Sequence, residues 1–267
     1  MKTSPLFSSL LAVYTLTHRE VVRFLRQRNR VFGALAQPVL FWLIFGQGLS
    51  GARFHSVNVG YSEYFFPGII VLVVLFTAIF ATISIIDDRN TGFLQSVLVA
   101  PVPTLAIVMG KVAGTTVLAV GQGVFVCALA ALPGGFEIGL GGLAASIPVL
   151  ILLSIALAGV GLMIAWPMDS TQGFHAIMMA FLMPMWLLSG AFFPPGGTPT
   201  WLGWIIALNP LTYGVALLRY SLYAPGSPAT MGLPPFSFCL AATIAFAVAT
   251  LGGSVFVARD RAGGRHP

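Results

Sequence analysis

The sequence predicts an all-α integral membrane protein with six transmembrane helices, and three observations carry this prediction. Of the 267 residues, 57% are hydrophobic and only 7% are charged, whereas about a quarter of the residues are charged in a typical soluble domain. Uncharged runs near the roughly 20 residues that a helix needs to cross a bilayer recur along the chain. The basic residues gather between these runs, on the side that the positive-inside rule assigns to the cytoplasm.

Cutting the chain at its charged residues places the six helices in order. The first run contains Pro38, which neighbouring helices must accommodate, and the second opens with aromatic residues typical of a membrane interface. We detect no internal repeat and no low-complexity linker, so residues 1–267 are expected to form one domain. The spans are expected at about 31–52, 64–86, 111–132, 142–165, 173–192 and 236–258.

The orientation in the membrane follows from the basic residues. With the N-terminus inside, all of the thirteen Lys and Arg except Arg53 and Arg219 lie on the cytoplasmic side. Because an even number of spans returns the chain to its starting side, the segment 259–267 is expected in the cytoplasm as well. The net charge of +6 then reflects loops beside anionic lipid headgroups, and no nucleic-acid partner is expected. We expect the protein in the inner, cytoplasmic membrane of the cell.

Residues 8–30 have the pattern of an amphipathic helix, and residues 1–30 are expected to form an interfacial element before the first span. Apolar side chains recur at spacings of three and four. A basic face is formed by Arg19, Arg23, Arg26 and Arg30. Two interpretations stay open: an anchor whose arginines lie near lipid phosphates, or a docking helix for a cytoplasmic partner.

The stretch IIDDRNTGFLQSVLVAPVPTLAIVMGK, residues 85–111, links the second and third spans on the cytoplasmic side. Its apolar residues fall at i, i+1, i+4 and i+5, which is a helical spacing, and prolines at 101 and 103 end the pattern. The apolar stripe consists of Phe93, Leu94, Val97 and Leu98. Because a connector needs only a few polar residues, this shaped face favours a short lateral helix on which a partner docks.

Asp87 and Asp88 are the only adjacent carboxylates in the chain. They are expected at the N-terminal side of the lateral helix, where the helix dipole favours negative charge, with Thr91 as a candidate cap. An acid–base role is not supported, because adjacent residues on a helix diverge by about 100°. Their charges are therefore expected to lie in water at a protein contact.

A second irregular segment, residues 193–235, precedes the last span. Its apolar pieces at 201–208 and 211–223 are each too short to cross a bilayer, and Asn209 and Pro210 separate them. Counting both as one span would place the C-terminal arginines outside. We therefore expect two short helices that dip back into the outer leaflet, where they are buried against protein or face a cavity.

The remaining motifs exclude most chemistry in this chain. Cys127 and Cys239 lie in apolar runs without metal-ligand spacing, so neither a metal site nor a disulfide is expected. The stretch GKVAGTT from Gly110 lacks the first glycine of a phosphate-binding loop and the Ser or Thr after its lysine. Few ionisable residues fall inside the expected spans, which disfavours an ion-coupled carrier. The chain is expected to move a substrate with energy supplied by another chain.

Four stretches, taken in order, resemble the permease subunits of type-2 ABC exporters, including the multidrug and polysaccharide export branches. They are HREVVRFLRQRNRVFGALAQPVLFWLIFG, DDRNTGFLQSVLVAPVPTLAIVMGK, MPMWLLSGAFFPP and LNPLTYGVALLRY. Their order and spacing cover most of the chain. The loop departs from many relatives, which carry an acidic E-R-E-x-G-T-like start where this chain has Asp88 to Phe93.

The resemblance implies a six-span permease that is not itself an enzyme and pairs with a second copy of the chain as a homodimer. Separately encoded ATPase subunits would hold ATP and Mg, so no cofactor is expected in this chain. The lateral helix matches the family's coupling helix, and the Arg helix matches its connecting helix. The ATPase-coupling residues implied are Asp87, Asp88, Arg89, Asn90, Thr91, Gly92, Phe93, Leu94, Val97 and Leu98.

The split segment before the last span matches the outer re-entrant helices of the family, as a gate or as a simple structural cap. The gate residues implied are Phe192, Phe193, Asn209, Pro210, Tyr213 and Arg219. The path would run between the two copies, lined by the second and fifth spans, and carry an amphipathic, drug-like or lipid- or glycan-linked substrate outward. Two alternatives stay open: an ATP-independent carrier or scaffold, and a membrane-embedded lipid-modifying enzyme.

Overall fold

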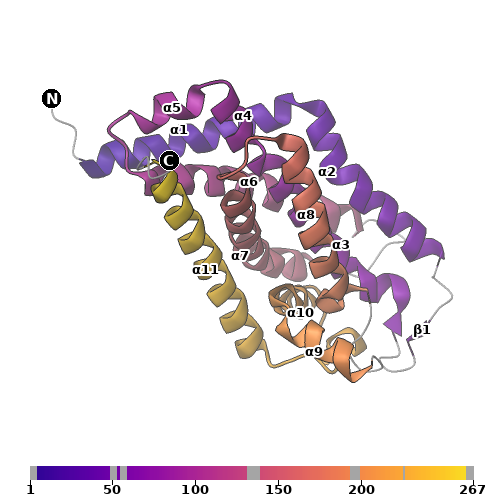
Figure 1. Cartoon of the computed structure of the whole chain (residues 1–267). Coiled ribbons are helices and arrows are strands. Elements are labelled where there is room, and N and C mark those ends of the chain that lie inside the picture. Colours follow the sequence, from indigo (N-terminus) through magenta and orange to yellow (C-terminus); the bar gives the residue numbers. More distant parts are fainter. Residues whose placement is uncertain are drawn as a thin grey trace.

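The computed structural model describes residues 5–48, 53–54, 59–130, 139–192, 199–224 and 226–262, and almost all of them are helical (Figure 1). The fold is that of an all-α integral membrane protein, as predicted. The first half comprises α1 (Pro5–Arg26), α2 (Arg28–Phe41), the π-helix η1 (Trp42–Gln47), β1 (Arg53–Phe54), β2 (Val59–Gly60), α3 (Tyr61–Thr82), α4 (Ser84–Asn90), α5 (Phe93–Leu98) and α6 (Thr104–Ala130). The second half comprises α7 (Leu140–Ala165), α8 (Thr171–Trp186), the π-helix η2 (Leu187–Ala191), α9 (Thr200–Leu208), α10 (Pro210–Leu222), the 3-10 helix η3 (Pro228–Thr230) and α11 (Phe236–Ala262).

Within the described residues, five helices are long and apolar enough to cross a membrane, and the bent pair of α9 and α10 makes six if it counts as one span. The five are Tyr61–Asn90, Thr104–Ala130, Leu140–Ala165, Thr171–Ala191 and Phe236–Asp260. The first expected span, 31–52, falls on α2 and η1 and is not among them. Helix α2 has 14 residues, contains Pro38 and continues directly into η1.

The third expected span begins earlier than residue 111. Helix α6 starts at Thr104, directly after Pro103, whose carbonyl accepts the N–H of Ala106. Proline suits the start of a helix because the first turn leaves its N–H groups unpaired. Lys111 therefore lies inside α6, where it is buried. The second span likewise continues past residue 86, because α4 follows α3 after the single residue Ile83.

Helix α3 is the centre of the bundle. Its most apolar window is 94% buried, as expected of a helix that is hydrophobic all round. A Cβ added to Gly68 would lie 2.6 Å from the Cβ of Ala191 in η2, and Trp186 Nε1 donates to the Gly68 carbonyl at 2.7 Å. Such close approach through small residues is typical of packing between membrane helices. Because α3 is enclosed, the expectation that the second span lines a path between two copies is wrong for this conformation.

Helix α1 lies across the end of the bundle where α4, α5 and the last turns of α11 are found (Figure 1). It packs on α6 at two glycines: a Cβ on Gly110 or Gly114 would lie 2.7 Å from the Cβ of Leu16 or Glu20, respectively. Larger residues at these positions would push α1 away from α6. The large apolar side chains that α1 leaves exposed are Phe7, Leu10, Leu11, Tyr14 and Leu25.

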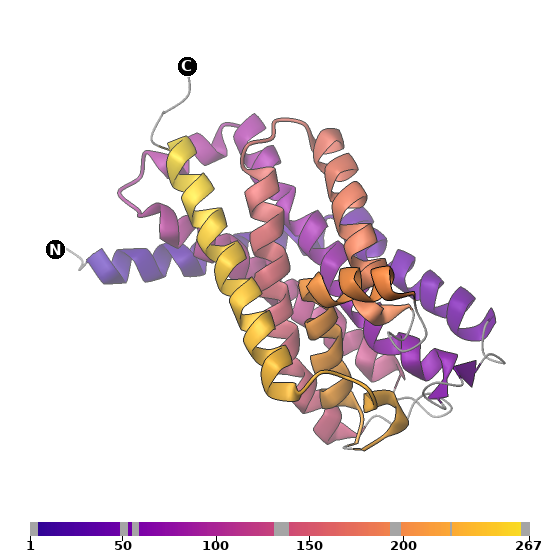
Figure 2. The same ribbon diagram turned by 60° about the horizontal axis from the view of Figure 1, so that its bottom comes forward.

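The other end of the bundle carries α9, α10 and the short β1–β2 pairing, in which Arg53 lies opposite Gly60. Figure 2 shows α11 running along the flank of the bundle beside α7. The break predicted at Asn209–Pro210 is present, and α9 and α10 meet there at a bend of 81°. Asn209 Oδ1 accepts the N–H of Leu211 at 3.0 Å and thereby caps α10, while Nδ2 donates to the Met185 carbonyl at 2.5 Å.

Candidate functional site

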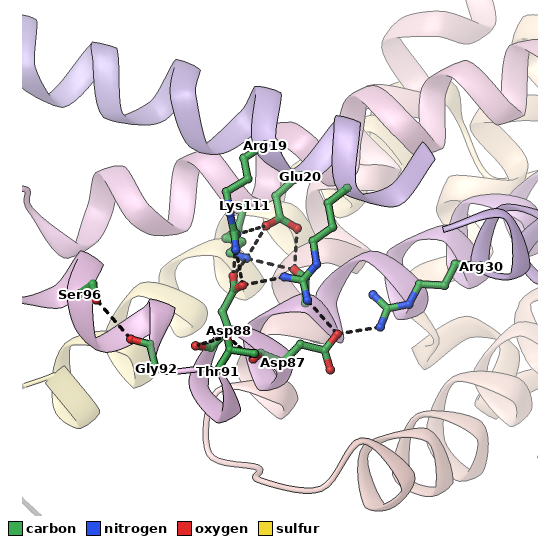
Figure 3. A network of polar contacts seen from close by, with 11 residues as sticks. Arg19, Glu20, Arg30, Asp87, Asp88, Thr91, Gly92, Ser96 and Lys111 are labelled. Atoms are coloured by element: carbon green, nitrogen blue, oxygen red, sulfur yellow. Dashed lines mark hydrogen bonds and ion pairs between the residues drawn. The ribbon is translucent and has the colours of Figure 1, made fainter. Parts of the chain in front are cut away.

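A network of charged side chains joins α1, α4 and α6 at the end of the bundle crossed by α1 (Figure 3). Its centre is Asp88 in α4, whose side chain is only 1% exposed. The carboxylate accepts from Arg19 Nη2 at 2.7 Å and from Arg23 Nη1 at 2.6 Å on Oδ1. On Oδ2 it accepts from Arg19 Nη1 at 3.0 Å and from Lys111 Nζ at 2.5 Å. Three cations from two helices thus hold one carboxylate of a third.

The buried side of this charge network is formed by Glu20 and Lys111. Lys111 Nζ donates to Glu20 Oε1 at 2.5 Å and to Ser84 Oγ at 3.1 Å. Ser84 Oγ in turn donates to Glu20 Oε2 at 2.6 Å. The side chains of Lys111 and Glu20 are 4% and 5% exposed, so the pair is screened from water and each member depends on the other.

The exposed side of the charge network surrounds Asp87. Its Oδ2 accepts from Arg30 Nη2 at 2.7 Å and from Arg23 Nη2 at 3.1 Å. The basic face of α1 and α2 is therefore directed largely at these two carboxylates rather than at lipid phosphates. Of the four predicted arginines, Arg26 alone forms no ion pair within the described part of the chain.

Arg19 is the most tightly bound of these arginines. Burial disfavours its charge, but the hydrogen bonds and the negative charge of Asp88 outweigh this effect and raise the pKa of Arg19 above its usual value. Its guanidinium also lies over the ring of Phe93, 3.6 Å from the centroid. Arg19 thus connects α1 with both α4 and α5.

Asp87 and Asp88 precede the lateral helix α5, as predicted, but the expectation that both charges lie in water is wrong for Asp88. Both belong to α4, the continuation of the second span, and Asp88 is buried among cations. Thr91 does not cap the following helix either, because its Oγ1 donates back to the Asp87 carbonyl at 2.9 Å. Gly92 instead separates α4 from α5 with a φ of 76°, in the left-handed region that glycine tolerates.

The lateral helix is shorter than predicted, and its apolar stripe faces its own chain. Leu94 is buried, and the stripe residues Phe93, Val97 and Leu98 are partly buried against the core. The residues that point outward at this helix are Gln95, Ser96 and Val99. The most exposed side chains at α5 are therefore these three, whereas the stripe is largely covered by the chain's own core.

Arg89 and Asn90 fasten α4 to the turn after α7. Arg89 Nη1 donates to Asp169 Oδ1 at 2.9 Å and to the Met168 carbonyl at 3.0 Å, and Nη2 donates to the Trp166 carbonyl. Asn90 Nδ2 donates to the Asp169 carbonyl at 3.4 Å. A cavity of about 250 Å³ opens between this turn and α5, lined by Arg89, Leu94, Gln95, Leu98, Trp166 and Asp169.

Sequence reasoning missed Glu20, Ser84 and Lys111 as members of the site. The available signal was the sign of the charges: Glu20 is the only acidic residue of the Arg helix, and Lys111 is the first charged residue after Arg89. Glu20 and Lys111 lie 91 positions apart in the chain, so no local pattern connects them.

The predicted gate residues do not form one cluster. Phe192 packs among Phe45, Phe65 and Trp186, with ring centroids 5.0 to 5.9 Å away. Asn209 caps α10, and the Tyr213 hydroxyl donates to the Ala207 carbonyl at 2.5 Å. Phe193 lies outside the described residues.

Arg219 falls within the short helix expected at 211–223; it lies in the last turn of α10 and is only 2% exposed. Its Nη2 donates to the carbonyls of Gly190 at 3.0 Å and Tyr64 at 3.3 Å. The guanidinium also lies 3.9 Å from the centroid of the Tyr64 ring. Burial follows because α10 packs against α3 and η2.

Comparisons with known proteins identify the family to which most of this chain is similar. A family model described as ABC-2 type transporter matches residues 12–223. The chain is 27% identical over 224 residues to a Cyanophora paradoxa protein named as transport permease ycf38. The aligned region covers 83% of this chain and 77% of that protein. It is 26% identical over 218 residues to the inner membrane transport permease YadH of Escherichia coli (strain K12), covering 79% and 82%. It is also 26% identical over 163 residues to an Escherichia coli (strain K12) protein named as a multidrug ABC transporter permease, YbhR, covering 60% and 44%.

Proposed function

The chain belongs to the ABC-2 type transporter family and is a multi-pass transport permease, and on this premise we propose that it is the membrane-spanning subunit of an ATP-driven exporter. The family implies an ATPase partner in general. In this proposal the partner is a separate chain that holds ATP and Mg, and the energy of hydrolysis reaches the permease through α5. The single observation that carries the proposal is the attachment of α5 to the charge network.

Three features of α5 support a role in coupling. Gly92 turns the chain so that α5 leaves the axis of α4. Val99, at its C-terminal end, exposes 85% of its surface although it is apolar, so its side chain is accessible to a partner chain. Gln95 and Ser96 add polar groups beside it. A cleft of the ATPase would grip this end of α5.

The charge network then transmits a movement of α5 to the helices α1, α4 and α6. Phe93 in α5 packs against the Arg19 guanidinium, and Arg19 is held by Asp88 in α4. Asp88 also binds Lys111 of α6. Because the buried carboxylate loses its compensation if one helix moves alone, we propose that α1, α4 and α6 move as one unit when the ATPase closes.

The transport path in this proposal lies between two copies of the chain. Helices α2 and α8 are better suited to line it than α3, because they leave large apolar side chains uncovered, among them Phe32, Leu40, Ile177 and Phe181. Such a surface fits an amphipathic, drug-like or lipid- or glycan-linked substrate. The bend at Asn209, which is held to α8 through the Met185 carbonyl, would form the outer gate together with Phe192. The name of the relative YadH supports the inner membrane as the location.

The experiment co-expresses the permease with P-loop ATPase chains from its own genome, beginning with any encoded in the neighbouring reading frames, and measures complex formation and permease-stimulated ATP hydrolysis. The test variant is Val99→Asp, which places a charge on the outward end of α5. We expect it to lower stimulated hydrolysis at least tenfold while membrane insertion is retained. Leu94→Asp is less informative, because Leu94 is buried and its replacement would also disturb packing.

The matched control is Leu140→Asp. Leu140 is apolar and also 85% exposed, but it begins α7, whose far end contacts α4 through Arg89. It therefore lies at the opposite end of the bundle and should leave hydrolysis unchanged. If Val99→Asp retains full stimulation, α5 is not the docking site. If no ATPase chain associates with the wild-type permease, the exporter proposal itself fails.

A further inference from the structure

A partly open cavity with one cationic side chain in its lining lies between α9, α10, η2 and the segment that leads into α11. It has a volume of about 140 Å³, and its lining includes Ser189, Gly190, Ile206, Tyr213, Arg219 and Leu233. Ser189 and Tyr213 already donate to backbone carbonyls at 2.6 and 2.5 Å. Arg219 is therefore the one charged group among the cavity's lining residues.

Within the described residues, no carboxylate balances the charge of Arg219. None of the ion pairs in this part of the chain involves Arg219. The Tyr64 ring and the carbonyls of Tyr64 and Gly190 offset part of the desolvation. Buried charges in proteins are normally paired with an opposite charge. Arg219 lacks such a counter-ion among the described residues.

A donor of the same side chain is also unused. Arg219 Nε is buried and has no hydrogen-bond partner in the described structure, which is costly for a charged donor. Arginine donors match the oxygens of a carboxylate or a phosphate. An oxyanion in the cavity would balance the charge of this side chain.

We propose that this cavity binds the anionic headgroup, a phosphate or carboxylate, of an amphipathic molecule, with Arg219 as the residue that recognises it. The apolar lining from Ile206 and Leu233 would contact the first carbon atoms of the apolar part. Most of the ligand would extend beyond the cavity, because 140 Å³ holds little more than a headgroup. The inference deepens the proposed function and rests on it only for the idea that such a ligand is transported.

The test measures binding to the purified full-length permease without an ATPase, by native mass spectrometry in detergent. The probes are dihexanoyl phosphatidic acid, dihexanoyl phosphatidylcholine as the lipid without net charge, and inorganic phosphate alone. We expect phosphatidic acid to bind at least tenfold more tightly than either of the others. Equal binding of the two lipids would overturn the proposal, and equal binding of inorganic phosphate would overturn the assignment to an amphipathic ligand.

Two variants locate the binding site. Arg219→Met should remove the preference for phosphatidic acid, with folding checked by the thermal unfolding midpoint. Gly203→Leu leaves Arg219 in place; a Cβ at Gly203 meets no atom within 4 Å, so the side chain can occupy the cavity that Gly203 lines. Its matched control is Gly121→Leu on α6, where a Cβ also meets nothing within 4 Å.

Gly203→Leu should lower the affinity for phosphatidic acid at least tenfold, and Gly121→Leu should leave it unchanged. Retention of the preference by folded Arg219→Met, or by Gly203→Leu, would overturn the proposal. Because no step requires ATP, failure of this binding test is distinct from failure of the exporter proposal, which is read from ATP hydrolysis.

Discussion

Replacement of Lys111 by methionine tests whether the charge network holds the helices together. Methionine keeps an unbranched apolar side chain, one atom shorter than lysine, but removes the ammonium group, which lies 2.5 Å from oxygens of both Glu20 and Asp88. Glu20 would then retain Arg19, at 3.4 Å, as its one cation and the Ser84 hydroxyl, at 2.6 Å, as a hydrogen-bond donor among the described residues. Removal of one partner of a buried ion pair lowers the free energy of unfolding by about 3–5 kcal/mol. This range applies to Lys111 because its side chain is only 4% exposed.

The matched variant is Arg30→Met, which removes a cation from the exposed side of the same network. The side chains of Arg30 and Asp87 are 22% and 24% exposed, and Asp87 keeps Arg23 at 3.1 Å. Ion pairs in contact with water contribute about 1 kcal/mol or less. The two variants should therefore differ by about 2–4 kcal/mol in the free energy of unfolding.

The assay is equilibrium unfolding in mixed micelles with increasing sodium dodecyl sulfate, followed by far-ultraviolet circular dichroism. The double variant Glu20→Gln/Lys111→Met should be less destabilised than the sum of its single changes, because it leaves no carboxylate at position 20 without its lysine. The reasoning is refuted if Lys111→Met lowers the free energy of unfolding no more than Arg30→Met does.

Two further predictions concern the packing of the bundle. Gly68→Ala should lower the free energy of unfolding by about 1–3 kcal/mol, since its Cβ would meet the Cβ of Ala191 at 2.6 Å. The control Gly121→Ala, with open space around the Cβ, should not be destabilising. Equal effects of the two variants in the same unfolding assay would contradict the packing argument. Asn209→Ala should lower the free energy of unfolding by about 1 kcal/mol, because the N–H of Leu211 loses its cap. The same variant should increase proteolytic cleavage at the α9–α10 bend. Unchanged cleavage would show that the cap does not hold the bend.

The coupling segment shows how far the sequence reaches. The residues at 93, 94, 97 and 98 have a helical spacing, and a helix is present at Phe93–Leu98. The direction of the stripe was predicted wrongly, because periodicity identifies an apolar face without saying what covers it. Here the cover is the chain's own core, packed around Leu94. The exposed end of the helix, at Val99, followed only from the tertiary structure.

The sequence by itself determined what depends on neighbouring residues. Low charge and long apolar runs set the membrane class, and the Asn209–Pro210 pair set the bend between α9 and α10, because hydropathy and proline act over a few residues. The tertiary structure alone decided which charges meet. Asp88 and Lys111 are joined with Glu20 because α1 crosses α6 at two glycines, and ion pairing depends on distance in space rather than on distance along the chain.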